Sequence, residues 1–174
     1  MLIYKDFTNE DELCSDSYPM EIKHNGSIME VNGQNIKQNG GIDESLIGGN
    51  ASADGQDEVG AGADDSAITG INVVMTHKLC ETAFTKKDFK IYMKDFFKKT
   101  VAHLEKEGKA DRVPEFKKGA LEAMKTISNS FNDWVLYTGE SMDPEGSLVF
   151  GNYREDGITP YFWYFKDALI EEKF

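Results

Sequence analysis

The first 31 residues alternate apolar and polar residues over short stretches bounded by turn residues, a pattern typical of β-strands. Strands are predicted at residues 2–5, 20–24 and 28–31. Asn32-Gly33 follows the third stretch, and this dipeptide favours the two positive φ angles of a type I′ hairpin turn. The sequence therefore predicts that the chain begins with a β-meander.

Residues 85–131 replace this alternation with apolar residues at helical spacing, in two consecutive runs. Thr85 and Asp88 match the capping box of a helix start, and Gly108 is placed to end the first helix. The second helix is predicted to begin at about Asp111, and so short a connection forces an antiparallel hairpin. The inward positions are Phe89, Tyr92, Met93, Phe96, Phe97, Val101 and Leu104, then Val113, Phe116, Ala120, Ala123, Met124, Ile127 and Phe131.

Three aromatic runs follow the helices and predict the strands that complete an antiparallel sheet. They cover residues 134–137, 148–153 and 161–165, with turn-rich stretches between them. Residues 68–77 are β-branched and alternate enough to predict a further strand that returns the chain to this sheet. Strands combined with one helical hairpin indicate the α+β class, and the length fits a single domain over residues 1–174.

Residues 39–67 differ from the rest in composition, with seven glycines and seven acidic residues but no basic or aromatic residue. Such a segment cannot bury enough apolar surface to offset the entropy lost on ordering. We therefore predict a mobile acidic loop inserted between strands. Its apolar residues, Ile42 and Leu46-Ile47, either tether the loop to the body of the protein or contact a partner.

The charge of the chain is unevenly distributed. Its 19 basic and 31 acidic residues give a formal net charge of −12, which disfavours binding to nucleic acid and to anionic lipid. The hairpin, residues 85–131, nevertheless has twelve Lys and Arg against seven Asp and Glu, a net charge of +5 that leaves −17 on the remainder. Lys87, Lys90, Lys94 and Lys98 fall on the polar face of its first helix. One basic segment is thus predicted on an acidic body.

The sequence contains no recognisable membrane span or secretory signal, so a cytoplasmic protein without membrane insertion is expected. Its two cysteines, Cys14 and Cys80, are far apart and are predicted to be free thiols. Cys14 lies in an acidic string that disfavours its thiolate. Cys80, near His77, is interpreted as structural or idle.

Motifs for catalysis and for tight metal binding are absent from the sequence. No Cys-x-x-Cys pair or His-Glu-x-x-His occurs, and His24, His77 and His103 lie in different predicted elements, which argues against zinc. No glycine motif for phosphate binding is present either. We therefore expect a binding protein that is not an enzyme and requires no cofactor.

Calcium is the one ligand that the acidic clusters favour, because hard cations prefer several oxygen ligands. No EF-hand spacing is present, so these clusters either bind calcium weakly at the surface or are solvated carboxylates without a specific site. The candidate ligands are Asp143, Glu145, Glu155 and Asp156.

Two stretches together resemble the signatures of a known family. Residues 47–53, IGGNASA, and the segment from Phe131 through Gly139-Glu140 to Tyr153 are similar to the two signatures of the translationally controlled tumour protein family. The likeness extends over essentially the whole chain, from LIYKDFTNEDE to FKDALIEEKF. It implies a β-tent with a helical hairpin and a flexible acidic loop.

The resemblance also implies functions. Members bind calcium, associate with tubulin and microtubules, and have roles in growth, survival and stress; regulation of a Rheb-like small GTPase, as exchange factor or nucleotide-free chaperone, is the alternative. Glu12 matches the position of the GTPase contact, and Ser45 matches a phosphorylated serine. Residues 80–122 match the tubulin- and calcium-binding region, which makes the lysines of the first helix candidates for tubulin binding. The chain ends in Phe174 where some members have a crosslinking cysteine, so a monomer is expected. Members also leave cells without a signal.

Overall fold

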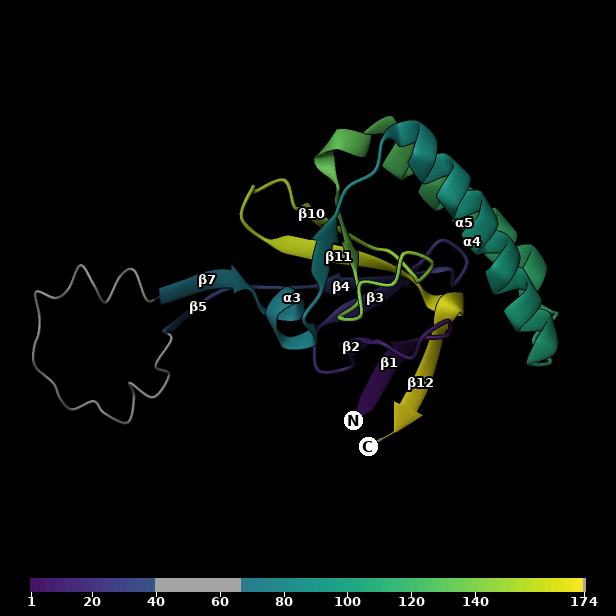
Figure 1. The fold of residues 1–174 in the computed structure, drawn as a ribbon, viewed down its shortest axis with the longest axis horizontal. Coiled ribbons are helices and arrows are strands. Elements are labelled where there is room, and N and C mark those ends of the chain that lie inside the picture. Colours follow the sequence, from purple (N-terminus) through teal and green to yellow (C-terminus); the bar gives the residue numbers. More distant parts are fainter. Residues whose placement is uncertain (40–66, 174) are drawn as a thin grey trace, which may run out of the picture.

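The computed structural model describes residues 1–39 and 67–173, and these residues form antiparallel sheets with a helical hairpin (Figure 1). The predicted α+β class is confirmed. The predicted loop at 39–67 lies outside the described residues, apart from its two end residues.

The largest sheet has six antiparallel strands, in which neighbours along the sheet are often distant along the chain. Its order is β3 (Met20–Lys23), β4 (Ile28–Asn32), β11 (Pro160–Phe165), β10 (Val149–Tyr153), β9 (Val135–Thr138) and β8 (Cys80–Thr82).

Two smaller sheets complete the β structure. The first joins the two ends of the chain, because β1 (Leu2–Asp6) lies between β12 (Leu169–Lys173) and β2 (Glu12–Ser15). The second is a ribbon of β5 (Asn35–Asn39) and β7 (Ala67–Ile71), which projects from the body in Figure 1.

The first hairpin turn lies at a different place from the one predicted. Residues His24, Asn25 and Gly26 all have positive φ and connect β3 to β4. The prediction of a turn at Asn32-Gly33 is wrong, because β4 pairs with β3 and β11 while β5 pairs with β7. The N–H of Gly33 instead donates a hydrogen bond to Pro160 O (3.0 Å).

The segment predicted as one strand at residues 68–77 is half strand and half helix. β7 ends at Ile71 and pairs only with β5, so it does not return the chain to the six-stranded sheet. Helix α3 (Asn72–His77) follows, and Asn72 Oδ1 accepts the N–H groups of Val73 and Gln34 (both 2.8 Å). This side chain satisfies one backbone donor at the start of the helix and one in the connection between β4 and β5. The β-branched residues of the segment favour a strand and gave no indication of this helix.

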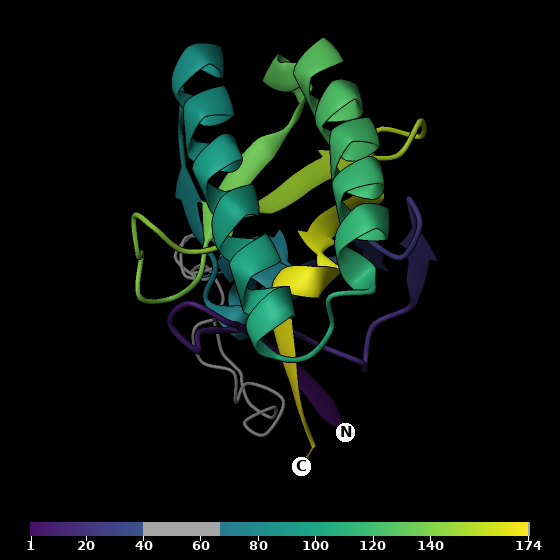
Figure 2. The same ribbon diagram turned by 90° about the vertical axis from the view of Figure 1, so that its right-hand side faces the viewer.

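The helical hairpin forms as predicted, from α4 (Lys86–Lys106) and α5 (Arg112–Asn129), which lie side by side in Figure 2. Thr85 is the N-cap of α4, and its Oγ1 accepts the N–H of Asp88 (3.1 Å). Gly108 has φ +73°, the conformation that ends a helix most readily at glycine. The 3₁₀ turn η2 (Phe131–Asp133) leads into β9, and η3 (Lys166–Ala168) connects β11 to β12.

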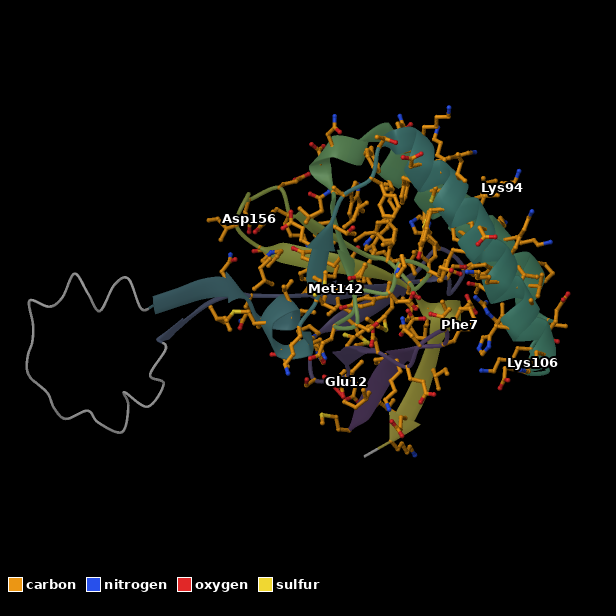
Figure 3. All side chains as sticks on the ribbon, viewed as in Figure 1. Phe7, Glu12, Lys94, Lys106, Met142 and Asp156 are labelled. Carbon is orange, nitrogen blue, oxygen red and sulfur yellow. The ribbon has the colours of Figure 1, made fainter. Side chains whose placement is uncertain are left out.

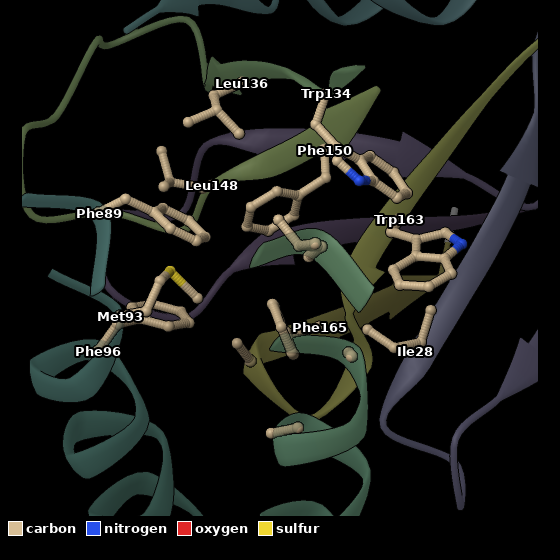
Figure 4. Close-up of a cluster of buried hydrophobic side chains, with 14 of the residues drawn as sticks. Ile28, Phe89, Met93, Phe96, Trp134, Leu136, Leu148, Phe150, Trp163 and Phe165 are labelled. Atoms are coloured by element: carbon tan, nitrogen blue, oxygen red, sulfur yellow. The ribbon is translucent and has the colours of Figure 1, made fainter. Parts of the chain in front are cut away.

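The six-stranded sheet separates two hydrophobic clusters. Along β11, Trp163 and Phe165 belong to the cluster beneath the helices, whereas Phe162 and Tyr164 belong to the cluster beneath β1 and β2. This alternation follows from the two-residue period of a strand. Figure 4 shows the first cluster, where Phe89 of α4 meets Phe150 of β10 edge to face, with ring centroids 5.8 Å apart. Both faces of the sheet are therefore covered, and the hairpin packs on the sheet through its inward apolar side.

Candidate functional site

The outer side of α4 carries exposed lysines that have no ion-pair partner among the described residues. Lys87, Lys90, Lys94 and Lys98 are all exposed, while the buried side of the helix contains Phe89. Lys94 points away from the sheet in Figure 3. Ammonium groups that lack a carboxylate partner remain available to an acidic ligand. We call these four residues the lysine face.

Lys99, on the same helix, lies in a different environment. Its Nζ lies 3.0 Å from Glu145 Oε1 and 3.5 Å from Asp95 Oδ2. The hydrogen bond to Glu145 raises the pKa of Lys99 above its ordinary value. This lysine connects the hairpin to the loop before β10, so the lysine face excludes it.

Two exposed apolar side chains lie among the lysines of the hairpin. Ile91 is 60 % exposed, four residues after Lys87 and three before Lys94. Leu121 of α5 is 59 % exposed and lies three residues after Lys118 and four before Lys125. Residues three and four apart are neighbours on a helix surface, so each helix presents an apolar side chain flanked by two cations. Sequence reasoning placed the lysines but missed this apolar contribution.

A second group of charged residues, at the turn between β1 and β2, is occupied by hydrogen bonds. Asp6 is 1 % exposed, and its Oδ1 accepts the N–H and Oγ1–H of Thr8 (2.8 and 2.7 Å). Its Oδ2 accepts the N–H of Ser147 (2.6 Å). This carboxylate therefore joins the N-terminal turn to the start of β10.

Further contacts bind the same turn to the loop between β9 and β10. Asp143 Oδ2 accepts a hydrogen bond from Asn9 Nδ2 and Oδ1 accepts one from the N–H of Glu145 (both 2.9 Å). These donors hold the pKa of Asp143 below its usual value. Asp11 Oδ2 accepts hydrogen bonds from the N–H and the Oγ–H of Ser141 (3.2 and 2.5 Å). We call Asp6, Asn9, Asp11 and Asp143 the acidic clamp.

The four candidate calcium ligands form two separate pairs. Asp143 and Glu145 precede β10, whereas Glu155 and Asp156 follow it, so the pairs lie at opposite ends of this strand. Asp156 Oδ1 accepts the N–H groups of Ile158 and Thr159 (both 2.8 Å), which holds the pKa of Asp156 below its usual value. Within the described residues, no group of three His, Cys, Asp or Glu side chains is arranged to hold a metal ion. The structure does not bring the four carboxylates together.

The predicted GTPase contact, Glu12, lies at the start of β2 on the side of the molecule away from the hairpin (Figure 3). Its side chain is 49 % exposed, and its Oε2 lies 3.7 Å from Nδ1 of the buried His77, too long for a hydrogen bond. His77 Nε2 is 3.1 Å from the Tyr18 hydroxyl. Burial lowers the pKa of His77, and the Glu12 carboxylate offsets part of this effect.

The comparisons with known proteins agree with this fold over its full length. A family model described as translationally controlled tumour protein matches residues 1–170. This chain belongs to the translationally controlled tumour protein family. A family member from Xenopus laevis is 49 % identical over 175 residues, which cover 99 % of each chain, and one from Branchiostoma belcheri is 45 % identical over the whole of both.

Solved structures of translationally controlled tumour proteins are similar in the same way. The Schizosaccharomyces pombe protein superposes with a TM-score of 0.79 at 40 % identity, over 100 % of both chains. The Caenorhabditis elegans protein gives 0.66 at 30 % identity, over 100 % of this chain and 99 % of that one. None of these relatives carries the name of an enzyme. The resemblance found in the sequence is therefore confirmed.

The other residues singled out in the sequence are the two cysteines and Ser45. Cys14 is fully buried, and burial raises the pKa of its thiol to about 12, with the neighbouring Asp16 a smaller contribution than the sequence argument gave it. Cys80 is partly exposed, and both thiols are free. Ser45 lies outside the described residues, so its phosphorylation stays a prediction. No helix among the described residues is long and apolar enough to span a bilayer.

Proposed function

We propose that this family member is a multi-partner binding protein whose lysine face docks onto acidic protein surfaces, in particular the glutamate-rich tails of tubulin on microtubules. The observation that carries the proposal is a set of four exposed lysines with no ion-pair partner in residues 1–39 and 67–173, on a chain with a formal net charge of −12. Because the rest of the molecule is acidic, an acidic partner is attracted to the hairpin and repelled elsewhere.

The exposed apolar residues of the hairpin add a second contribution to binding. Ile91 and Leu121 supply apolar area beside the cations, and lysine side chains themselves cover apolar surface with their methylene groups. A partner segment with both carboxylates and occasional apolar side chains matches this surface. Since the charges are exposed, the interaction is expected to weaken as the salt concentration rises.

Microtubule cosedimentation of a charge-reversed variant tests the proposal. Replacing Lys90, Lys94 and Lys98 by Glu removes the attraction and introduces repulsion, and we expect the apparent affinity for microtubules to fall at least about tenfold. Unchanged cosedimentation of this triple variant would refute the proposal.

A matched control separates the lysine face from net charge. Reversing Lys78, Lys166 and Lys173 changes the formal charge of the chain by the same amount but leaves the hairpin intact. This control should keep most of the microtubule affinity. Equal losses in both triple variants would indicate a general charge effect and would contradict a specific lysine face.

Regulation of a Rheb-like small GTPase is the second candidate function, and Glu12 favours it. Its carboxylate is half-exposed and makes no hydrogen bond among the described residues, unlike the carboxylates of the acidic clamp. The test is release of a fluorescent nucleotide from the GTPase: the wild type should accelerate it, Glu12→Val should abolish most of the acceleration, and Glu21→Val on β3 should not. Absence of acceleration at high protein concentration would rule the function out.

A further inference from the structure

Strand β8 ends the six-stranded sheet, and its outer edge is unpaired. Cys80–Thr82 pair with β9 on one side, and no described residue forms a backbone hydrogen bond with them on the other. The amide and carbonyl groups on such an edge form a template for another strand. When a peptide adds to such an edge, main-chain hydrogen bonds supply affinity and pockets for alternate side chains supply specificity.

A hollow of about 250 Å³ is lined by all three residues of β8 and lies on the helix side of the sheet, to which Thr82 and its cross-strand partner Leu136 belong. Its lining is mainly apolar, with contributions from Phe84, Tyr92, Pro144 and Leu148. Met142, 64 % exposed and at φ +57°, stands at the rim. A methionine held in this exposed position is a flexible contact for an apolar ligand group.

A second hollow of about 410 Å³ lies on the opposite face, to which Glu81 belongs. Ile71, Val74, Leu79 and Tyr137 form its walls, together with the half-exposed Tyr153. Because successive side chains of a strand point to opposite faces, a strand added beside β8 would place alternate side chains in the two hollows. At the other end of the six-stranded sheet, the hollow beside Ile22 of β3 is lined largely by charged residues.

The charge at this edge indicates which peptide fits. Glu81 is exposed, and it has no ion-pair partner among the residues that the structure describes. Residues directly opposite in an antiparallel pair lie on the same face, so the residue facing Glu81 would be cationic and its two neighbours would enter the hollow lined by Phe84 and Leu148.

We propose that the β8 edge is a peptide-binding site, which takes an extended segment of a partner protein with a basic residue between two apolar residues. The segment joins the six-stranded sheet as an antiparallel strand. The site lies on the sheet side of α4 and does not depend on the lysine face, so it goes beyond the function proposed above.

The probe is the capped peptide acetyl-Thr-Leu-Lys-Leu-Thr-amide, added to the full chain labelled with ¹⁵N. We expect saturable amide shifts at residues 79–84 and slower maleimide alkylation of Cys80, whereas Cys14 stays unreactive because it is buried. The same peptide with N-methyl groups on the edge that faces β8 should not bind. Saturable shifts elsewhere, or equal binding of the N-methylated peptide, would overturn the proposal.

Charge reversal tests the register of the added strand. Glu81→Lys should weaken the Lys peptide about fivefold and strengthen the matching Glu peptide about fivefold, as expected for a cross-strand charge pair. Glu21→Lys, an exposed reversal on the opposite edge strand, should change neither. Identical affinities of wild type and Glu81→Lys for both peptides would contradict the site. A poorly folded variant would lose affinity for both peptides, whereas the proposal predicts that Glu81→Lys gains affinity for the Glu peptide.

Discussion

The lysine face and the acidic clamp carry opposite charges and are built in opposite ways. On the lysine face, four cations project into solvent without ion-pair partners among the described residues. In the acidic clamp, the carboxylate oxygens of Asp6 and Asp143 accept hydrogen bonds from residues far away in sequence. Carboxylates that accept several hydrogen bonds stabilise a fold, whereas exposed charges without partners contribute little to it. The comparison therefore supports a structural role for the clamp, in which Asp6 is buried, and agrees with the binding role proposed for the lysine face.

The largest change in stability is expected when the Asp6 side chain is removed. Asp6→Ala leaves three donors without their acceptor, two of them from Thr8 and one from Ser147. The Ser147 N–H is the buried donor among the three, whereas Thr8 is exposed and can bond to water, so we expect the free energy of unfolding in urea to fall by about 2 kcal/mol. Glu105→Ala, an exposed acidic position on α4, should stay within about 0.5 kcal/mol. Equal stability of the two variants would contradict a structural role for the clamp.

His77 gives the next largest effect, in the dependence of stability on pH. Burial lowers the pKa of His77 in the folded state, so the unfolded chain binds its proton more readily. Stability should therefore decrease as the pH falls below about 6.5, the unfolded value, until the folded pKa is passed, with a slope of at most about 1.4 kcal/mol per pH unit. His77→Gln should reduce this slope, as measured by urea unfolding at several pH values. A slope unchanged by the substitution would remove His77 as its source.

Calcium binding tests the clamp directly, because an ion at Asp143 must compete with Asn9 and the N–H of Glu145 for the carboxylate oxygens. We expect only weak binding, with a dissociation constant on the order of 1 mM and a stabilisation of about 0.4 kcal/mol at 1 mM calcium. Asp143→Asn should remove the amide shifts at residues 139–147 and leave those at 154–159. A single saturable transition that includes both regions would mean that the two pairs form one site.

The smallest effect is expected at the lysine face. Lys94→Gln removes one exposed charge that pairs with no carboxylate in the described part of the chain, so the free energy of unfolding should change by less than about 0.5 kcal/mol. Thermal and urea unfolding measure this change. A loss of several kcal/mol would show that the lysine is part of the fold, which would remove the contrast with Asp6.

Sequence reasoning placed the elements that have strong local signals. The capping pair Thr85 and Asp88, the apolar period of α4 and the aromatic runs of β9 to β11 each fix an element from neighbouring residues. It failed where local preference and tertiary contact disagree: β8 is a strand of three residues with no pattern of its own, and residues 72–77 are β-branched yet helical.

The candidate site divides in the same way. Helical spacing alone puts the lysines on one face of α4, because that face follows from a single element. The acidic clamp could not be predicted, since Asp6 at the end of β1 meets Ser147, in the loop before β10, across 141 positions. The sequence shows Ile91 and Leu121 as apolar residues on the polar faces of their helices. Their role at the surface could be proposed only once the structure showed them exposed beside lysines.

The most direct test of the account maps where an acidic ligand binds. A glutamate-rich peptide with the sequence of a tubulin tail, titrated into the ¹⁵N-labelled chain, should give saturable amide shifts on α4 around Lys87–Lys98 and none at the acidic clamp. The shifts should shrink as salt is added. Saturable shifts outside the hairpin, or no saturable shift on α4 at low salt, would contradict the assignment of binding to the lysine face.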